Sequence, residues 1–118
     1  MGSFSIEIEI GDSARERWVT LDALVDTGAF ITSVPASTLR ELGVEPMGQR
    51  RVRFGQGEVR NLDYGQTWLR AEGQEITTFV LFNDEGTTPL LGAYAIECLF
   101  MAVDPVTQQL VPLEEIHI

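Results

Sequence analysis

The stretch Leu24-Val25-Asp26-Thr27-Gly28-Ala29 places an acid directly after a run of apolar residues. An ionised carboxylate at the end of a buried strand is costly unless hydrogen bonds or a second group share its charge. Thr27 and Gly28 can supply such partners, because a hydroxyl both donates and accepts and a glycine lets a backbone N–H approach closely. Asp26 is therefore the residue of this chain best placed to carry chemistry.

The other residue types leave few competing chemistries. The only cysteine is Cys98, the only histidine is His117, and the eight basic residues are all arginine. A zinc site of clustered His and Cys, or a triad that needs a central histidine, is disfavoured, and Cys98 is expected to pack as a small apolar residue. The absence of lysine excludes a Schiff base and a phosphate-loop lysine. We expect carboxylate chemistry with no cofactor and no metal.

The Asp26-Thr27-Gly28-Ala29 segment resembles the active-site motif of the retropepsin-like aspartic proteases, in particular their bacterial members. The resemblance extends over most of the chain, from Phe4 to Pro112. Its further parts are the apolar pair before the motif, an apolar segment ending in glycine, and two short segments near the C-terminus: Leu24-Val25, Pro89-Leu90-Leu91-Gly92, Val103-Asp104-Pro105 and Leu110-Val111-Pro112.

The resemblance implies peptide hydrolysis by two carboxylates that share one proton and activate a water molecule. The Asp-Thr-Gly motif occurs once here, so the second carboxylate would be Asp26 of another copy across a two-fold axis. The implied roles are Asp26 as the catalytic residue, Thr27 as a hydrogen-bonding residue across the axis, and Gly28 and Ala29 as support for the loop. The expected partners are a second copy and a peptide or protein substrate.

Two segments are candidates for the dimer interface. They are the apolar N-terminal strand and the C-terminal segment 113–118, because unpaired apolar edges are unfavourable in a monomer. In retroviral relatives the termini interleave between subunits. Alternatively, the C-terminal segment pairs within its own barrel, and the sequence does not distinguish the two arrangements.

Residues 51–62 are predicted to form two strands around Gly55-Gln56-Gly57. Two glycines beside one polar residue are typical of a mobile hairpin tip. The resemblance implies that this hairpin is the flap that closes over the substrate and excludes water. An ordinary surface hairpin is the alternative interpretation.

Two positions depart from the retroviral pattern. Phe30 follows the motif where many retroviral members carry Asp or Ser, and Ala93 follows Gly92 where those enzymes usually carry Arg. We assign Phe30 and Leu91 to the substrate pocket, where Phe30 would form an apolar wall. Retroviral substrate preferences are therefore not transferred to this chain.

The balance of charge also limits the class of partner. The net charge is −10, which argues against nucleic-acid binding, since that requires a basic surface. No secretory signal and no membrane span are predicted, and a cytoplasmic location is expected. Five arginines fall in or near the flap, and we favour an exposed strand face over a basic rim that selects acidic substrates: Arg50, Arg51, Arg53, Arg60 and Arg70.

Alternating and short apolar segments predict a mainly β protein. One domain, 1–118, is expected to form a small closed β-barrel of the retropepsin-like type with one or two short helices. The helices are predicted from Pro35 to Gly43 and from Ala93 to Leu99. The predicted strands are 4–10, 17–25, 31–34, two within 51–62, 66–70, 76–82, 100–103, 110–112 and 116–118.

Three functions are compatible with these features. The leading hypothesis is a homodimeric aspartic endopeptidase. The second is a catalytically silent retropepsin-like module for dimerisation or peptide binding, because a fold does not determine function. The third is a hydrolase that uses two acids of one chain about 5–10 Å apart, as glycosidases do, for which Asp63, Asp84 and Asp104 have no distinctive sequence context.

Overall fold

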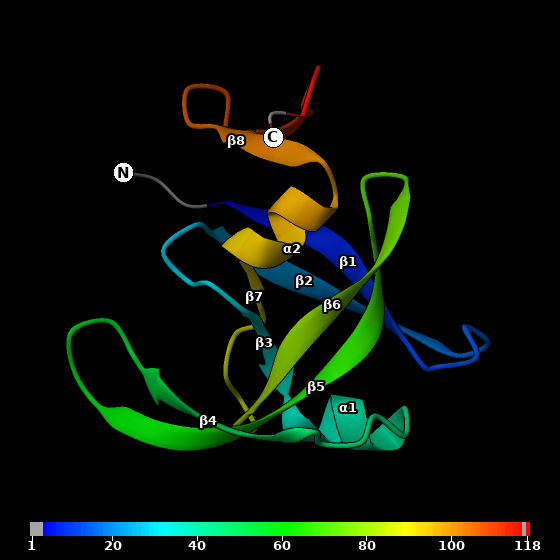
Figure 1. Cartoon of the computed structure of the whole chain (residues 1–118), viewed down its shortest axis with the longest axis vertical. Coiled ribbons are helices and arrows are strands. Elements are labelled where there is room, and N and C mark those ends of the chain that lie inside the picture. The colour runs from blue at the N-terminus through cyan, green and yellow to red at the C-terminus, as the bar shows by residue number, and fades with distance from the viewer. Residues whose placement is uncertain (1–3, 117) are drawn as a thin grey trace.

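The first two strands form an antiparallel hairpin that ends at Asp26. The computed structural model of the protein describes residues 4–116 and residue 118 (Figure 1). Strand β1 (Ser5–Gly11) pairs along its whole length with β2 (Trp18–Asp26). Ile8 and Ile10 of β1 are buried, while Glu7 is exposed and Glu9, between the two isoleucines, is half-buried. This alternation is the pattern that predicted the strand, because successive side chains point to opposite faces.

Six strands close into a barrel, in the order β1-β2-β7-β3-β6-β5 and back to β1. Among the described residues, strand β4 pairs only with β5 and lies outside this ring as an edge strand. The predicted mainly β closed barrel is confirmed. The remaining strands of this sheet are β3 (Thr32–Pro35), β4 (Gly48–Arg53), β5 (Val59–Ala71), β6 (Gln74–Asn83) and β7 (Leu90–Gly92).

Two of the strand pairs in the barrel are parallel. Strand β2 runs parallel to β7, and β3 runs parallel to β6. Strands β3 and β7 meet in the antiparallel sense through the pair Ser33 and Leu90. The segment that follows Asp26 is therefore bordered by strands from a distant part of the chain.

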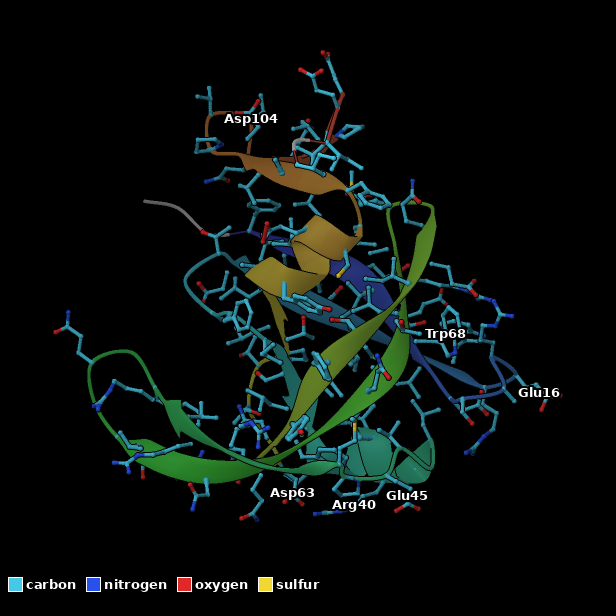
Figure 2. The ribbon with its side chains drawn as sticks, in the orientation of Figure 1. Glu16, Arg40, Glu45, Asp63, Trp68 and Asp104 are labelled. Atoms are coloured by element: carbon cyan, nitrogen blue, oxygen red, sulfur yellow. The ribbon has the colours of Figure 1, made fainter. Side chains whose placement is uncertain are left out.

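The seam that closes the ring joins β1 to β5. Gly11 pairs with Trp68, and the buried Thr67 hydroxyl donates to the Gly11 carbonyl at 2.9 Å. Figure 2 shows Trp68 on the side of the molecule that carries Glu16. The Arg15 guanidinium lies 4.4 Å from the centre of the Trp68 ring, a cation–π contact that covers the seam from outside.

Two short helices and a small second sheet complete the fold. Helix α1 (Ala36–Glu41) follows β3, and α2 (Ala93–Cys98) follows β7. Strands β8 (Met101–Asp104) and β9 (Gln109–Pro112) form a separate antiparallel pair, and α2 contacts both β8 and the barrel (Figure 1). None of the helices within residues 4–116 is long and apolar enough to cross a membrane.

The structure differs from the predicted elements in two places. Separate strands were expected to end at Leu62 and to start at Gln66, but β5 is continuous through Gly65 and stays paired with β6. Gly65 allows the backbone at Glu45 to approach β5 closely, since a Cβ at position 65 would lie 2.9 Å from the Glu45 carbonyl oxygen. The expected strand 116–118 is absent at residues 116 and 118, and residue 117 lies outside the described residues.

Candidate active site

Asp26 is the last residue of β2 and is partly buried. Its Oδ1 accepts a hydrogen bond of 2.9 Å from the Gly28 N–H, and its carbonyl accepts one of 3.1 Å from the Ala29 N–H. No donor within the described residues reaches its Oδ2. The carboxylate is thus oriented by its own loop through one oxygen, and the second oxygen remains available to another group.

The loop after Asp26 is held by the segment that follows β7. Asp26 pairs with Gly92. The N–H of Ala93 donates to the Ala29 carbonyl at 2.8 Å, and the N–H of Tyr94 donates to the Phe30 carbonyl at 3.0 Å. These bonds fix a loop whose backbone groups would otherwise need water or side-chain partners.

Gly92 allows this contact because the two backbones approach very closely. A Cβ at Gly92 would lie 2.7 Å from the carbonyl carbon of Ile31 and 2.9 Å from the Phe30 carbonyl oxygen. Its own N–H donates to the buried Thr32 hydroxyl at 3.0 Å. The segment Pro89-Leu90-Leu91-Gly92, singled out in the sequence, therefore packs directly against the loop that follows Asp26.

Thr27 is exposed beside Asp26. Its hydroxyl has no hydrogen-bond partner among residues 4–116 and 118. A hydroxyl at the surface is free to bond to another molecule. The role of Thr27 across a two-fold axis stays a prediction.

A cleft of about 920 Å³ opens beside Asp26. One wall is the loop of Asp26, Gly28 and Ala29, and the opposite wall is β4 with the first residues of the hairpin tip. Between them lies an apolar surface to which Leu62, Phe79, Leu81 and Leu90 contribute. The lining of the cleft is mostly apolar, which suits a ligand with apolar side chains better than a compact polar one.

The two residues assigned to the substrate pocket have different positions. Phe30 lines the cleft and is 67% exposed. Leu91 does not line the cleft, because it is fully buried in the core, and the assignment of Leu91 is wrong. Its neighbour Leu90 lines the cleft instead, since adjacent residues of a strand point to opposite faces.

Aromatic residues not predicted for the site continue from Phe30 in a row. The ring of Phe30 lies 5.9 Å from Tyr94, Tyr94 lies 5.8 Å from Phe79, and Phe79 lies 6.0 Å from Tyr64, between ring centres. Such spacings are favourable for aromatic pairs. The sequence offers no local signal for this row, because its members come from a loop, a helix and two strands that meet only in the folded barrel.

The hairpin of β4 and β5 extends away from the barrel, in green in Figure 1. Its tip is a tight turn in which Phe54 donates to the Glu58 carbonyl at 2.9 Å and Gly57 donates to the Phe54 carbonyl at 3.0 Å. Gly55 has a φ of +61°, a conformation that glycine adopts without strain. Gly55 lines the cleft, whereas Gln56 and Gly57 do not. The closing motion expected of a flap stays a prediction.

Arg60 connects the hairpin to the body of the molecule. Its Nη1 lies 2.6 Å from Asp84 Oδ2, in the loop after β6, and its Nε lies 3.6 Å from Glu58 Oε1. The guanidinium carbon lies 4.6 Å from the centre of the Phe54 ring. Since Phe54 lines the cleft, Arg60 couples the position of the cleft wall to a loop of the barrel.

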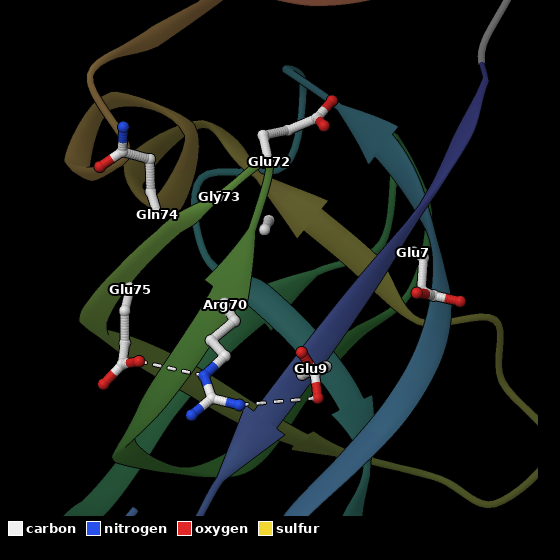
Figure 3. A pocket seen from close by; sticks show the side chains of 8 residues that line it. Glu7, Glu9, Arg70, Glu72, Gly73, Gln74 and Glu75 are labelled. Atoms are coloured by element: carbon white, nitrogen blue, oxygen red, sulfur yellow. Dashed lines mark hydrogen bonds and ion pairs between the residues drawn. The ribbon is translucent and has the colours of Figure 1, made fainter.

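A second hollow, of about 360 Å³, lies on β1 and the β5–β6 turn (Figure 3). Glutamates line it, and Arg70 bridges two of them, at 3.0 Å to Glu75 and 3.9 Å to Glu9. Hydrogen bonds from Arg70 and then Arg15 hold the pKa of Glu75 below its ordinary value of 4.5. Within the described residues no group of three or more His, Cys, Asp or Glu is placed to bind a metal.

Comparison with known proteins adds evidence from structure. No family model and no curated protein sequence matches the chain. The simian foamy virus (mac) protease is similar in structure, with a TM-score of 0.57 and 22% identity over 80% of this chain and 92% of that chain. A retropepsin-like aspartic protease from Rickettsia conorii has a TM-score of 0.56 and 18% identity over 87% of this chain and 88% of that one.

The chain has the retropepsin-like fold. A foamy viral protease-reverse transcriptase, solved in complex with an RNA/DNA hybrid, shares this fold with a TM-score of 0.58 and 16% identity. The match covers 93% of this chain but only 13% of that much longer chain. In the retropepsin-like fold as this chain builds it, the Asp26 loop, the Gly92 segment and the hairpin of β4 and β5 surround one cleft.

Proposed function

We propose that this protein is an aspartic endopeptidase whose active site forms between two copies. The observation that carries the proposal is that Asp26 is the only acidic residue among the described residues that line the large cleft. The solved proteases with the same fold support a hydrolase of this class. A glycosidase-like mechanism needs two acids of one chain in the same cleft. The described residues that line this cleft include no second acid, so that mechanism is disfavoured.

The proposed reaction uses Asp26 of both copies. One carboxylate removes a proton from a water molecule, and the resulting hydroxide attacks the carbonyl carbon of the scissile peptide bond. The other Asp26, in its protonated form, donates its proton to the carbonyl oxygen. As the tetrahedral intermediate collapses, the first Asp26 gives its proton to the leaving nitrogen, the second Asp26 regains its proton from a hydroxyl of the intermediate, and the C–N bond breaks, so that a carboxylic acid and an amine are released.

A second copy is needed because one carboxylate cannot act as acid and base in the same step. Two carboxyl groups placed about 3 Å apart titrate separately, so that one is protonated while the other is ionised. The free Oδ2 of Asp26 and the exposed Thr27 suit a symmetric contact. Exposed apolar side chains near the C-terminus, Leu113 and Ile116, offer additional surface to a second copy.

The central test is the Asp26→Asn substitution. Asn keeps the Oδ1 acceptor for the Gly28 N–H, so the fold and the loop should persist while peptide cleavage falls by at least about a thousandfold. The matched control is Asp22→Asn, an exposed position on the same strand, which should cleave at the wild-type rate. Cleavage by the Asp26→Asn protein at the wild-type rate would overturn the proposal.

The two-copy requirement has its own measurement. Specific activity should fall on dilution in parallel with the dimer fraction measured by sedimentation, and a statine-type transition-state mimic should bind one molecule per dimer. Full specific activity from a particle that sediments as a monomer would contradict the shared site.

A silent peptide-binding module is the second candidate function. Phe30, 67% exposed in the cleft, and the free edge of β4 can hold an extended peptide without any chemistry. This function predicts peptide binding that is equal in wild-type and Asp26→Asn proteins, with no cleavage by either. Cleavage by the pure wild-type protein that is lost in Asp26→Asn would reject it.

A further inference from the structure

Three arginines of β4 line the same cleft as Asp26: Arg50, Arg51 and Arg53. None of them forms an ion pair with an acid among residues 4–116 and 118. The arginines that do form ion pairs do not line this cleft, and each lies within 4 Å of at least one carboxylate. They are Arg15, Arg17, Arg60 and Arg70. In a chain with a net charge of −10, three of the four arginines without an ion pair among the described residues, all but Arg40, thus lie at one wall of one cleft.

Neutral groups hold two of these cations in place. The Arg50 guanidinium lies 4.7 Å from the centre of the Tyr64 ring and donates to the Gln49 carbonyl at 2.8 Å. Arg53 donates to the Gly57 carbonyl at 3.2 Å. A guanidinium has five N–H donors, so each of these contacts leaves most donors free for an anionic ligand while limiting side-chain motion.

The surroundings strengthen the effect of these charges on a ligand in the cleft. Asp26 is the only acid that lines the cleft among the described residues, and the surface between the two walls is largely apolar. A cleft in which one sign of charge predominates, as the three arginines do here, concentrates oppositely charged ligands. The favoured interpretation of the arginines as a solvent face alone is therefore incomplete, because this face borders the cleft.

We infer that the cleft selects peptides with an apolar residue at the scissile bond and Asp or Glu in the flanking residues that lie along β4. The apolar side chain would contact Phe30 and Leu90, and the flanking carboxylates would pair with Arg50, Arg51 and Arg53. This inference rests on the proposed peptidase function and adds a substrate class to it.

The first experiment compares peptides that differ only in flanking charge. Two peptides with the same apolar centre carry either Glu or Gln on both sides of it, and kcat/KM is measured for each with the wild-type protein. At about 50 mM salt the Glu peptide should be cleaved at least tenfold more efficiently, and the ratio should approach one at about 500 mM salt, where exposed charges are screened. Equal cleavage of both peptides at low salt would overturn the inference.

The second experiment locates the effect on β4. The variants Arg50→Gln, Arg51→Gln and Arg53→Gln should each lower the Glu-to-Gln preference about two- to fivefold, through KM rather than kcat, because these arginines are exposed and exposed ion pairs contribute in this range. Arg40→Gln on α1 is the matched control, because Arg40 is exposed, lies outside the cleft and loses the same charge. A control with the same loss of preference would show a bulk charge effect and overturn the inference.

A measurement of peptide binding tests this inference independently of the peptidase proposal. The Asp26→Asn protein is titrated with the fluorescently labelled Glu and Gln peptides, and anisotropy gives the dissociation constant of each. Tighter binding of the Glu peptide supports the selection even if no peptide is cleaved by the wild-type protein, whereas cleavage without any preference in binding or kcat/KM rejects the selection and leaves the peptidase intact.

Discussion

The backbone N–H of Gly92 donates to the hydroxyl of Thr32 at 3.0 Å in the core, directly behind the Asp26 loop. This bond links the end of β7 to the first residue of β3, which directly follows the loop of the candidate catalytic residue Asp26. The adjoining bonds from Ala93 and Tyr94 to the same loop make the contact continuous. The site therefore depends on two segments that are distant in sequence.

Substitution of Gly92 by alanine should destabilise the protein by about 1–3 kcal/mol, because the new Cβ would press on the Ile31 backbone at 2.7 Å. Urea unfolding measures the change. Gly57→Ala is the matched control, since its Cβ would meet only the Phe54 carbonyl at an ordinary 3.6 Å. A Gly92→Ala protein as stable as wild type would mean that the loop can move away, and the support we describe would not exist.

Replacing Thr32 by valine should cost about 1–3 kcal/mol of unfolding free energy, because the buried Gly92 N–H loses its acceptor while the side-chain shape is kept. Thr20→Val, an exposed position on β2, is the control and should change stability by less than about 0.5 kcal/mol. Comparable stabilities for the two variants would contradict the importance of this bond.

Loss of the Arg60–Asp84 pair should loosen the hairpin tip. In Arg60→Gln, the amides of Phe54 and Gly57, which bond within the tip, should exchange with deuterium several-fold faster, while global stability changes by only about 0.2–1 kcal/mol. Arg15→Gln breaks another exposed pair, with Glu75, and should leave the tip amides unchanged. Unaltered exchange at the tip in Arg60→Gln would show that Arg60 does not restrain the hairpin.

Acidic conditions should weaken the fold through Glu75. Its pKa is lower in the folded protein because Arg70 and Arg15 hydrogen-bond to its ionised form. Its contribution is therefore fully present above the ordinary pKa of 4.5 and is lost as the pH falls through the lowered folded-state pKa. Urea midpoints measured between about pH 6 and pH 3 should decline less steeply for Glu75→Gln than for wild type or for Glu72→Gln, an exposed neighbour. A parallel decline in all three proteins would exclude this linkage.

Most of the elements could be predicted from local pattern alone. Alternation in β1 and β2, the proline before α1 and the glycines of the hairpin tip each have a local physical meaning, and the structure has these elements close to the predicted bounds. Gly65 was misleading because a glycine that permits a close approach looks the same in sequence as one that interrupts a strand.

The site was predictable where its residues belong to a local motif, as at the Asp26 loop and at Gly55 of the hairpin tip. Asp26, Gly28 and Phe30 lie in one segment and all line the cleft. Leu91 was misassigned because a strand of three residues is too short to show which face is inward. Tyr64 and Phe79 were not predicted for the cleft because their meeting depends on the register of β5 and β6.

The contact between Gly92 and the Asp26 loop also orders events during synthesis. A ribosome releases the N-terminal part of a chain first, and Asp26 leaves it long before Gly92 does. Until the residues around Gly92 have emerged, the Asp26 loop lacks the backbone contacts with Gly92, Ala93 and Tyr94, so a nascent chain cannot hold this loop in its final conformation. For the peptidase that we propose, cleavage activity would therefore be expected only after the strand β7 has been synthesised.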